Sequence, residues 1–488
     1  MIGSDRTTDR PVVRAAASAR PRAIDALGRF GPWYEDEPFI HLRANGAGVV
    51  VTGAREQGLG HRVPRPDGDD DGVFGGWTWD GAGLRVGNDR YGFQPLYYFA
   101  GPGEIAVSTS IARLLAAGAP AELDHTALAL FLRLGCFVGE DTAFQAIRAV
   151  PPAARVQWRD GRLRIEGGFR ISPPQRLGRA AAIDAYIELF RTAMRRRSPG
   201  DDAFTVPLSG GRDSRHILLE LCEMGHRPAF TITARYFAPG DTSHGEVEIA
   251  EKLATALGVP HVVVGPPSSR LPAELRNNVE ANFSTTDIPW TLAVADYVRG
   301  RVSAVYDGIG GDVLSAGLLL TAERLELFRS GRLEALARHL LDADAYYDRR
   351  PFAGEVSRRL GTDVAVERLV RELGRHVEAA NPVGSFFFWN RTRRKIAMSP
   401  YRLLARAGAD VFAPYLDHDV FDLLSGLPAE FFLDHAFHTE AIHRAYPRHA
   451  DIPFSVKSKG ERTAAARRAG RRFALDVAAA LIDRKSVV

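Results

Sequence analysis

The sequence predicts an α/β protein of two domains, an antiparallel β-rich domain followed by a doubly wound parallel sheet. In the first half, short apolar runs such as residues 48–52 are separated by Gly, Asp and Pro, which is typical of antiparallel strands and turns. In the second half, apolar strands at 203–208 and 229–233 alternate with helical patterns, which favours parallel strands. A linker near Ile171-Ser-Pro-Pro174 separates the two patterns. We therefore expect domains at 1–170 and 175–488.

The composition excludes several classes of protein. The 488 residues are 45% hydrophobic and 25% charged, which is ordinary for a globular enzyme. No apolar run approaches the ~20 residues that span a bilayer, and the polar N-terminus does not resemble a signal peptide. The net charge of +4 is too small to indicate a nucleic-acid partner, and two cysteines are too few for a disulfide framework. We expect a cytoplasmic protein without a membrane or nucleic-acid partner.

The expected elements follow in chain order. The first ~20 residues are rich in Arg, Asp and Thr with a Pro, so we expect a loose segment, and strands with turns extend from about 40 to 157. One helix is expected at 126–134, with Asp124 near its start. The second domain then shows helices at 180–197, 215–224 and 246–257, strands at 203–208, 229–233, 261–264 and 304–306, and a mainly helical remainder from about 318.

A candidate phosphate loop, Ser209-Gly-Gly-Arg-Asp-Ser214, lies between a predicted strand and a predicted helix. Such a turn presents backbone N–H groups and the positive end of a helix to an anion, and glycine allows close approach. Asp213 adds negative charge, which a Mg²⁺ ion bridging it to phosphates would offset. The alternative is an ordinary Gly-rich turn, and the spacing alone does not choose between the two.

The loop resembles the pyrophosphate loop of ATP pyrophosphatases, and its surroundings resemble the asparagine synthetase family. The likeness extends from about Leu84 to Gly460. It is carried by five further segments in the family's order: Asn88-Asp-Arg-Tyr-Gly-Phe-Gln-Pro-Leu-Tyr-Tyr98, Gly135 to Phe144 with Val150-Pro-Pro152, Asp307-Gly-Ile-Gly-Gly-Asp312, Pro414-Tyr-Leu-Asp417, and Leu427-Pro-Ala429.

The resemblance implies the fold, the reaction and the site. The fold would be a glutaminase-like antiparallel β sandwich joined to an ATP-pyrophosphatase domain. That second domain would adenylate a carboxylate, release pyrophosphate and pass the acyl group to an amine, with ATP and Mg²⁺ bound. Asp213 and Asp312 would hold the metal. The ATP and pyrophosphate contacts would be Leu208, Ser209, Gly210, Gly211, Arg212, Asp213, Ser214, Thr233, Asp307 and Gly308.

The first domain departs from the family's glutaminase. Glutamine hydrolysis in this family requires an N-terminal cysteine nucleophile, whereas position 2 is Ile2. Cys136 and Cys222 lie elsewhere in the chain and suit buried apolar positions. The Asn-Gly-Glu-type segment that binds glutamine in the family has no counterpart. We expect a degenerate domain with a structural role, at 1–170.

The second departure concerns the base that deprotonates the amine. The family carries Glu at the third position of the acidic loop in asparagine synthetases and Tyr in β-lactam synthetases, whereas this chain has Ile309. An aliphatic side chain does not accept a proton. The pattern counts against an aspartate substrate and, less strongly, against a β-lactam-forming one. The proton must pass to another group, to the substrate or to water.

Two lysines, Lys457 and Lys459, lie where the family has a lysine that stabilises acyl transfer. We favour Lys459, because a Lys-Gly pair resembles the natural-product branches; the alternative is a solvated loop. On the substrate side we expect Ile309, Asp287 from an Asp-x-Pro element, and Arg215, which contacts an anion or faces solvent. An aromatic run, Phe386-Phe-Phe-Trp389, fits the core better than a substrate cleft.

Lasso-peptide cyclases and β-lactam synthetases are the family's branches with a degenerate glutaminase domain. The Gly311-Asp312 and Lys459-Gly460 pairs resemble the lasso-cyclase branch. This implies a ring-forming ligase in antibiotic biosynthesis, acting on a peptide that a leader-binding protein and a protease supply. The alternatives are ligation of an amine to a small acid, a β-lactam-forming enzyme, a nucleotide-binding protein without activity, and a tRNA-modifying pyrophosphatase, which the Pro414 segment disfavours.

Overall fold

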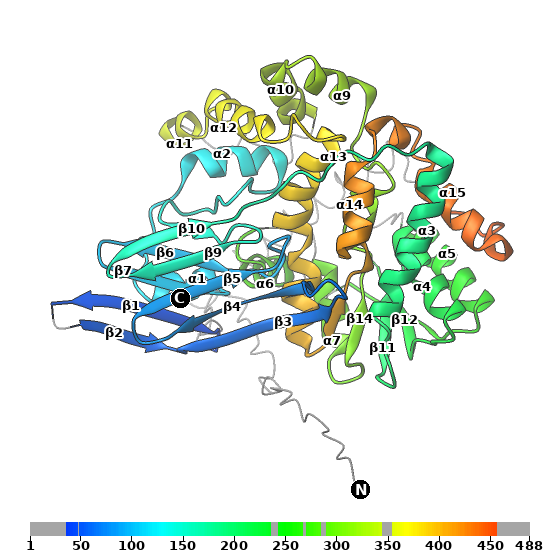
Figure 1. The fold of residues 1–488 in the computed structure, drawn as a ribbon, viewed down its shortest axis with the longest axis horizontal. Helices are drawn as coiled ribbons and strands as arrows, with labels where there is room; N and C mark the ends of the chain where they lie inside the picture. Colours follow the sequence, from blue (N-terminus) through cyan, green and yellow to red (C-terminus); the bar gives the residue numbers. More distant parts are fainter. Residues whose placement is uncertain are drawn as a thin grey trace, which may run out of the picture.

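The computed structural model describes residues 36–46, 48–235, 243–266, 270–284, 289–343 and 354–455. These residues form an antiparallel β sandwich and a parallel sheet with helices, which lie side by side (Figure 1). The predicted fold class is therefore confirmed. None of the described helices combines the length and the apolar character that crossing a bilayer requires.

The sandwich consists of two five-stranded antiparallel sheets. Its strands alternate buried and exposed side chains, because successive residues of a strand point to opposite faces. The buried face carries Ile40, Leu42, Trp77 and Trp158. In one sheet the order is β2 (Gly48–Gly53), β1 (Phe39–Asn45), β7 (Glu104–Ser108), β6 (Tyr97–Gly101) and β8 (Ile147–Ala149); in the other it is β10 (Arg162–Glu166), β9 (Arg155–Arg159), β5 (Gly83–Asn88), β4 (Asp70–Trp79) and β3 (Glu56–Pro64).

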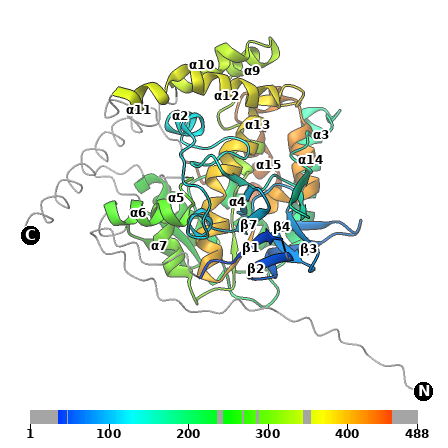
Figure 2. The same ribbon diagram turned by 90° about the vertical axis from the view of Figure 1, so that its left-hand side faces the viewer.

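Two helices accompany the sandwich, α1 (Ile111–Ala116) and α2 (His125–Leu134). The side chain of Asp124 accepts a hydrogen bond from the backbone N–H of Ala127, which caps α2 as the sequence predicts. Gly135 ends the helix in the left-handed region, at φ 70°. Helix α2 packs against α10 and α12 of the second domain, as Figures 1 and 2 both show.

The second domain contains a five-stranded parallel sheet in the order β13-β12-β11-β14-β15. The strand order reverses at β11, so β11 and β14 flank a topological switch point. Four strands occur where the sequence predicts them, and the fifth, β15, lies within the remainder predicted to be mainly helical. The bounds are β11 (Phe204–Pro207), β12 (Phe230–Ala234), β13 (His261–Val264), β14 (Ala304–Tyr306) and β15 (Asp410–Phe412).

Helices pack against this sheet and extend beyond it. Helix α4 contacts β11, and both α5 and α7 contact β12 and β13. The α helices are α3 (Arg179–Arg196), α4 (Asp213–Glu223), α5 (Ser243–Ala256), α6 (Arg270–Glu280), α7 (Pro289–Val298), α8 (Gly311–Leu314), α9 (Ala322–Arg329), α10 (Leu333–Ala343), α11 (Gly354–Arg359), α12 (Thr362–Gly374), α13 (Pro382–Phe387), α14 (His418–Gly426) and α15 (Phe437–Ala445). Two π helices, η1 (Phe388–Ile396) and η2 (Ser399–Leu404), follow α13, and 3₁₀ turns occur at Ala405–Ala407, Pro414–Leu416 (η4), Ala429–Phe432 and Pro447–His449.

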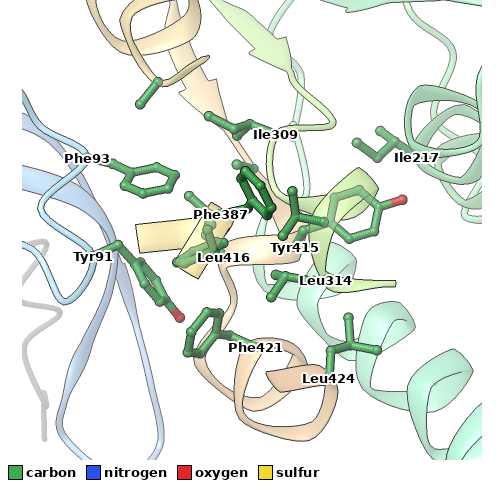
Figure 3. Close-up of a cluster of buried hydrophobic side chains, with 14 of the residues drawn as sticks. Tyr91, Phe93, Ile217, Ile309, Leu314, Phe387, Tyr415, Leu416, Phe421 and Leu424 are labelled. Atoms are coloured by element: carbon green, nitrogen blue, oxygen red, sulfur yellow. The ribbon is translucent and has the colours of Figure 1, made fainter. Parts of the chain in front are cut away.

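Buried aromatic side chains join the two domains. Tyr91 of the first domain meets Phe421 with ring centroids 4.9 Å apart, and Phe93 stacks on Phe388 at 5.5 Å. Figure 3 shows Tyr91 and Phe93 reaching from the first domain toward Leu416 and Phe421. The aromatic run at 386–389 is buried in this core, as expected. The contact fixes the sandwich against the domain that carries the two Gly-rich loops.

Candidate active site

Two loops meet at the carboxyl edge of the parallel sheet, on either side of the switch point. The phosphate loop (residues 208–214) follows β11, and the acidic loop (residues 307–312) follows β14. Ligands of open α/β sheets bind in the crevice at such a point. The fold therefore brings together two segments that are about a hundred residues apart in the sequence.

Internal hydrogen bonds shape the phosphate loop. The backbone N–H of Ser209 donates to the Ser214 hydroxyl at 3.1 Å, and that of Gly211 donates to the Ser209 hydroxyl at 3.1 Å. The Thr233 hydroxyl donates to the carbonyl of Leu208, which ties the loop to β12. Helix α4 begins at Asp213, so the positive end of its dipole lies at the loop. The predicted loop residues are thus assembled in one turn, and their contacts with ATP stay predictions.

The acidic loop lies directly against Asp213. A Cβ on Gly308 would lie 2.8 Å from the Asp213 Cβ, and a Cβ on Gly311 would lie 2.7 Å from the Asp213 Cγ. Both distances are too short for a side chain, so glycine is required at these positions. This close approach places Asp213 beside the acidic loop that carries Asp307 and Asp312.

The carboxylates of the acidic loop titrate abnormally. Burial raises the pKa of Asp307 to about 6, although the N–H of Ile309 donates to its carboxylate at 2.9 Å, and the charges of Asp213 and Asp312 add to the effect. The pKa of Asp312 is also raised, mainly by desolvation and further by the charge of Asp213. The guanidinium of Arg391, 3.6 Å away, opposes this shift. The side chain of Asp312 remains 38% exposed, so it is accessible from the site.

These residues fit a divalent cation. Like charges held close together raise the free energy of the site, and a cation between them lowers it. Mg²⁺ is usually bound through one or two carboxylates together with substrate phosphates. Within the described part of the chain, no three side chains of His, Cys, Asp or Glu are grouped to enclose a metal ion alone. The donor set therefore suits an ion that arrives with a phosphate ligand.

Of the two places expected for Arg215, an anion contact or solvent, the structure excludes solvent. Its side chain is 1% exposed, so the alternative that it faces solvent is wrong. Its guanidinium donates to the carbonyls of Ile452 and Pro453, at 2.6 Å each, and lies over the Phe454 ring at 4.0 Å. A direct contact with a substrate carboxylate would have to replace these bonds.

The segment that Arg215 holds crosses the phosphate loop. The N–H of Ser455 donates to the carbonyl of Gly210 at 2.8 Å, and a Cβ on Gly210 would lie 2.8 Å from that of Ser455. Arg212 also faces this segment, because its guanidinium lies 4.8 Å from the Phe454 ring. It donates a hydrogen bond to the Thr439 hydroxyl of α15 at 2.6 Å. Lys457 and Lys459 follow in the sequence and, like Asp287, lie outside the described residues.

Ile309 is buried and belongs to the hydrophobic core, where Figure 3 shows it above Phe387. Its side chain offers the site no group that accepts a proton.

The sequence reasoning missed His438, which contacts Asp213 from α15 with its Nδ1 3.3 Å from the carboxylate Oδ1. The available signal was His216, one helical turn after Asp213, because its imidazole contacts that of His438.

Comparisons with known proteins agree with this geometry. Residues 185–450 match the family model described as asparagine synthase, and residues 68–167 match the one described as a glutamine amidotransferase domain. The fold, the paired loops and this match define an ATP-dependent, amide-forming ligase. The chain belongs to the asparagine synthase family, whose model covers more than half of it.

More distant similarities concern part of the chain only. No curated protein matches. Among solved structures, the U34-tRNA thiolase NcsA from Methanococcus maripaludis is 14% identical over 41% of this chain and 80% of its own, with a TM-score of 0.22. NMN synthetase from Francisella tularensis is 14% identical over 41% and 94%, with a TM-score of 0.20. NH3-dependent NAD synthetase from Campylobacter jejuni is 12% identical over 40% and 96%, with a TM-score of 0.21.

Proposed function

We propose that this ligase adenylates a substrate carboxylate, releases pyrophosphate and transfers the acyl group to an amine that does not come from glutamine. The observation that carries the proposal is the contact between the phosphate loop and the acidic loop, in which Asp213 packs against Gly308 and Gly311. The loop's N–H groups and the positive end of α4 would bind phosphate oxygens, and Asp213 and Asp312 would hold Mg²⁺. When bound, that ion screens the charge of the triphosphate.

The independence from glutamine is supported by the places of the two cysteines. Cys136 is 4% exposed and follows α2, at the side of the sandwich domain that faces α12. Cys222 lies on α4 of the second domain, and burial raises the pKa of its thiol. The raised pKa of Cys222 leaves little thiolate, and the burial of Cys136 shields its thiol from a substrate. Neither cysteine therefore suits attack on a glutamine amide.

The burial of Ile309 supports a substrate other than aspartate. At the position where asparagine synthetases carry the acidic base, this chain has Ile309, whose side chain is buried in the hydrophobic core. The amine therefore loses its proton to another group, to the substrate or to water. Lys459, with Lys457 beside it, is the candidate for stabilising acyl transfer, because the segment that precedes it crosses the phosphate loop.

Within this class we favour a lasso-peptide cyclase, which forms a macrolactam from a precursor peptide. The Gly311-Asp312 and Lys459-Gly460 pairs support this branch. Its peptide would come from a leader-binding protein and a protease, encoded by neighbouring genes. The alternatives are intermolecular ligation of an amine to a small acid and a β-lactam-forming reaction.

A product assay tests the proposal. The protein is incubated with Mg·ATP and a peptide encoded beside its gene, and the mixture is examined for AMP, pyrophosphate and peptide mass. A cyclase yields AMP, pyrophosphate and a peptide lighter by one water, without glutamine. An intermolecular ligase yields the mass of acid plus amine less one water. Hydrolysis of added glutamine to glutamate, coupled to amide formation, would overturn the proposed independence.

A further inference from the structure

His438 lies where four segments that build the site converge. It is fully buried on α15 and contacts the hydroxyl of Ser315, just after α8, with its Nδ1 at 3.0 Å. Its Nε2 lies 3.2 Å from the Tyr186 hydroxyl of α3 and 3.4 Å from the Tyr415 hydroxyl of η4. Its Nδ1 also lies 3.3 Å from the carboxylate Oδ1 of Asp213. One imidazole thus lies between Asp213 of the phosphate loop and Ser315, whose hydroxyl in turn donates to Gly311 of the acidic loop.

The hydrogen-bond partners determine which nitrogen carries a hydrogen. The Ser315 hydroxyl donates to the carbonyl of Gly311 at 2.8 Å, so toward His438 it offers only a lone pair. An ionised Asp213 also only accepts. The Nδ1 atom of His438 therefore carries a hydrogen, which it donates to the Ser315 hydroxyl at 3.0 Å, and the Asp213 carboxylate lies alongside at 3.3 Å. This holds whether or not Nε2 carries a hydrogen as well.

The opposite side of the ring is fixed by a second histidine. The Nδ1 of His216 lies 3.2 Å from the Nε2 of His438, and the His216 ring stacks on Phe190 at 3.9 Å. Burial lowers the pKa of His216 well below its usual value, with His438 adding to the effect. The His438 ring is consequently confined on both edges and does not rotate freely.

We propose that His438 is a positioning residue, whose Nδ1–H edge lies 3.3 Å from the Asp213 carboxylate, keeps that carboxylate directed toward the acidic loop and so prepares the site for Mg·ATP. The inference rests on the proposed function, because it assigns Asp213 to the metal. Hydrogen-bonded partners behind a metal ligand fix its orientation, and their loss weakens metal affinity about 10- to 100-fold. Tyr415 contributes from the other side, because its hydroxyl donates to the Asp213 carbonyl at 3.1 Å.

Two conservative variants separate positioning from simple packing. In His438→Asn the amide nitrogen can take the place of Nδ1, so an N–H beside Asp213 is retained. In His438→Gln the amide reaches the place of Nε2, so contact with Tyr186 is retained and the N–H beside Asp213 is lost. His376→Gln is the matched control, since His376 is also fully buried but contacts Glu372, Ser385 and Asn390 and not Asp213.

The readout is binding of a non-hydrolysable ATP analogue, measured by calorimetry as a function of Mg²⁺ concentration, with folding checked by circular dichroism. We expect His438→Gln to raise the Mg²⁺ concentration for half-maximal binding about 10- to 100-fold. We expect His438→Asn to stay within a few-fold of wild type and His376→Gln to leave the Mg²⁺ dependence unchanged. An unchanged Mg²⁺ dependence in a folded His438→Gln protein overturns the inference, as does an equal loss in both His438 variants.

The experiment also separates this inference from the proposed function. A wild-type protein that binds no analogue at any Mg²⁺ concentration contradicts the proposed function itself. A wild-type protein with Mg²⁺-dependent binding, together with an unaffected His438→Gln variant, contradicts only the role of His438. If His438→Gln does not fold, Ser315→Ala replaces it. Removing the competing acceptor leaves Asp213 as the acceptor for Nδ1–H, and the Mg²⁺ requirement should stay at or below the wild-type value; a tenfold rise would overturn the inference.

Discussion

Glu37 joins the two domains through a buried ion pair, and neutralising it should destabilise their interface. The carboxylate is 4% exposed and accepts two hydrogen bonds from Arg402, at 2.8 and 2.6 Å. Arg406 lies 2.8 Å away, and the Thr109 hydroxyl donates at 2.7 Å. Glu37 and Thr109 belong to the sandwich side, whereas both arginines belong to the second domain. In Glu37→Gln the shape is kept and the charge is lost.

The magnitude follows from the pKa. Burial alone would raise the pKa of Glu37, but the charges of Arg402 and Arg406 lower it from 4.5 to about 2. At about 1.4 kcal/mol for each pKa unit, this corresponds to about 3 kcal/mol of stability near pH 7. Since the pKa is depressed in the folded state, this contribution is present above the unfolded value of 4.5 and is lost as the pH falls toward 2.

Urea denaturation followed by tryptophan fluorescence measures the effect at several pH values. We expect Glu37→Gln to lose about 3 kcal/mol at pH 7, with the difference from wild type shrinking below about pH 4.5. The control is Glu430→Gln. Glu430 is 49% exposed and pairs with Arg329 at the surface, and such a pair contributes under about 1 kcal/mol. A loss no larger than that of the control, or a loss that does not vary with pH, would refute the reasoning.

Two further predictions concern the site. Gly311→Ala places a Cβ 2.7 Å from the Asp213 carboxyl carbon, so it should separate the two loops and weaken Mg·ATP binding about tenfold or more, as measured by calorimetry. Gly87→Ala, where a Cβ meets nothing within 4 Å, should leave binding unchanged, and equal affinities for the two variants would contradict the close approach. Arg215→Met removes two charge-assisted hydrogen bonds to residues 452 and 453, so it should lower stability by about 2–4 kcal/mol and speed proteolysis at these residues. Arg227→Met loses a hydrogen bond to Leu257 at an exposed position and should change neither stability nor proteolysis much. Equal cleavage rates in the two variants would count against Arg215 as the residue that holds the segment.

Local sequence patterns predicted the elements well because periodicity and turn residues act within a few positions. The strands at 261–264 and 304–306 occur at the predicted residues, and Asp124 caps α2. The strand β15 was missed because its three residues carry too little periodicity to stand out from a helical region.

Long-range contacts were beyond the same reasoning. For Arg215 the sequence left an anion contact and solvent open, because nothing local indicates that residues 452–454 cover it. His438 lies more than two hundred residues from Asp213, and only the fold brings them together. The likeness to a family located the loops, but the residues that support those loops required the structure.

Carboxylate-dependent exchange of labelled pyrophosphate into ATP tests the central claim most directly, because it reports adenylation without the amine step. An N-acetylated peptide encoded beside the gene supplies the carboxylate and blocks its own amine. The proposed function predicts exchange that requires Mg²⁺ and the peptide, proceeds without glutamine and is abolished in Asp213→Asn. Amide formation that yields ADP with no exchange, or full exchange in Asp213→Asn, would contradict it.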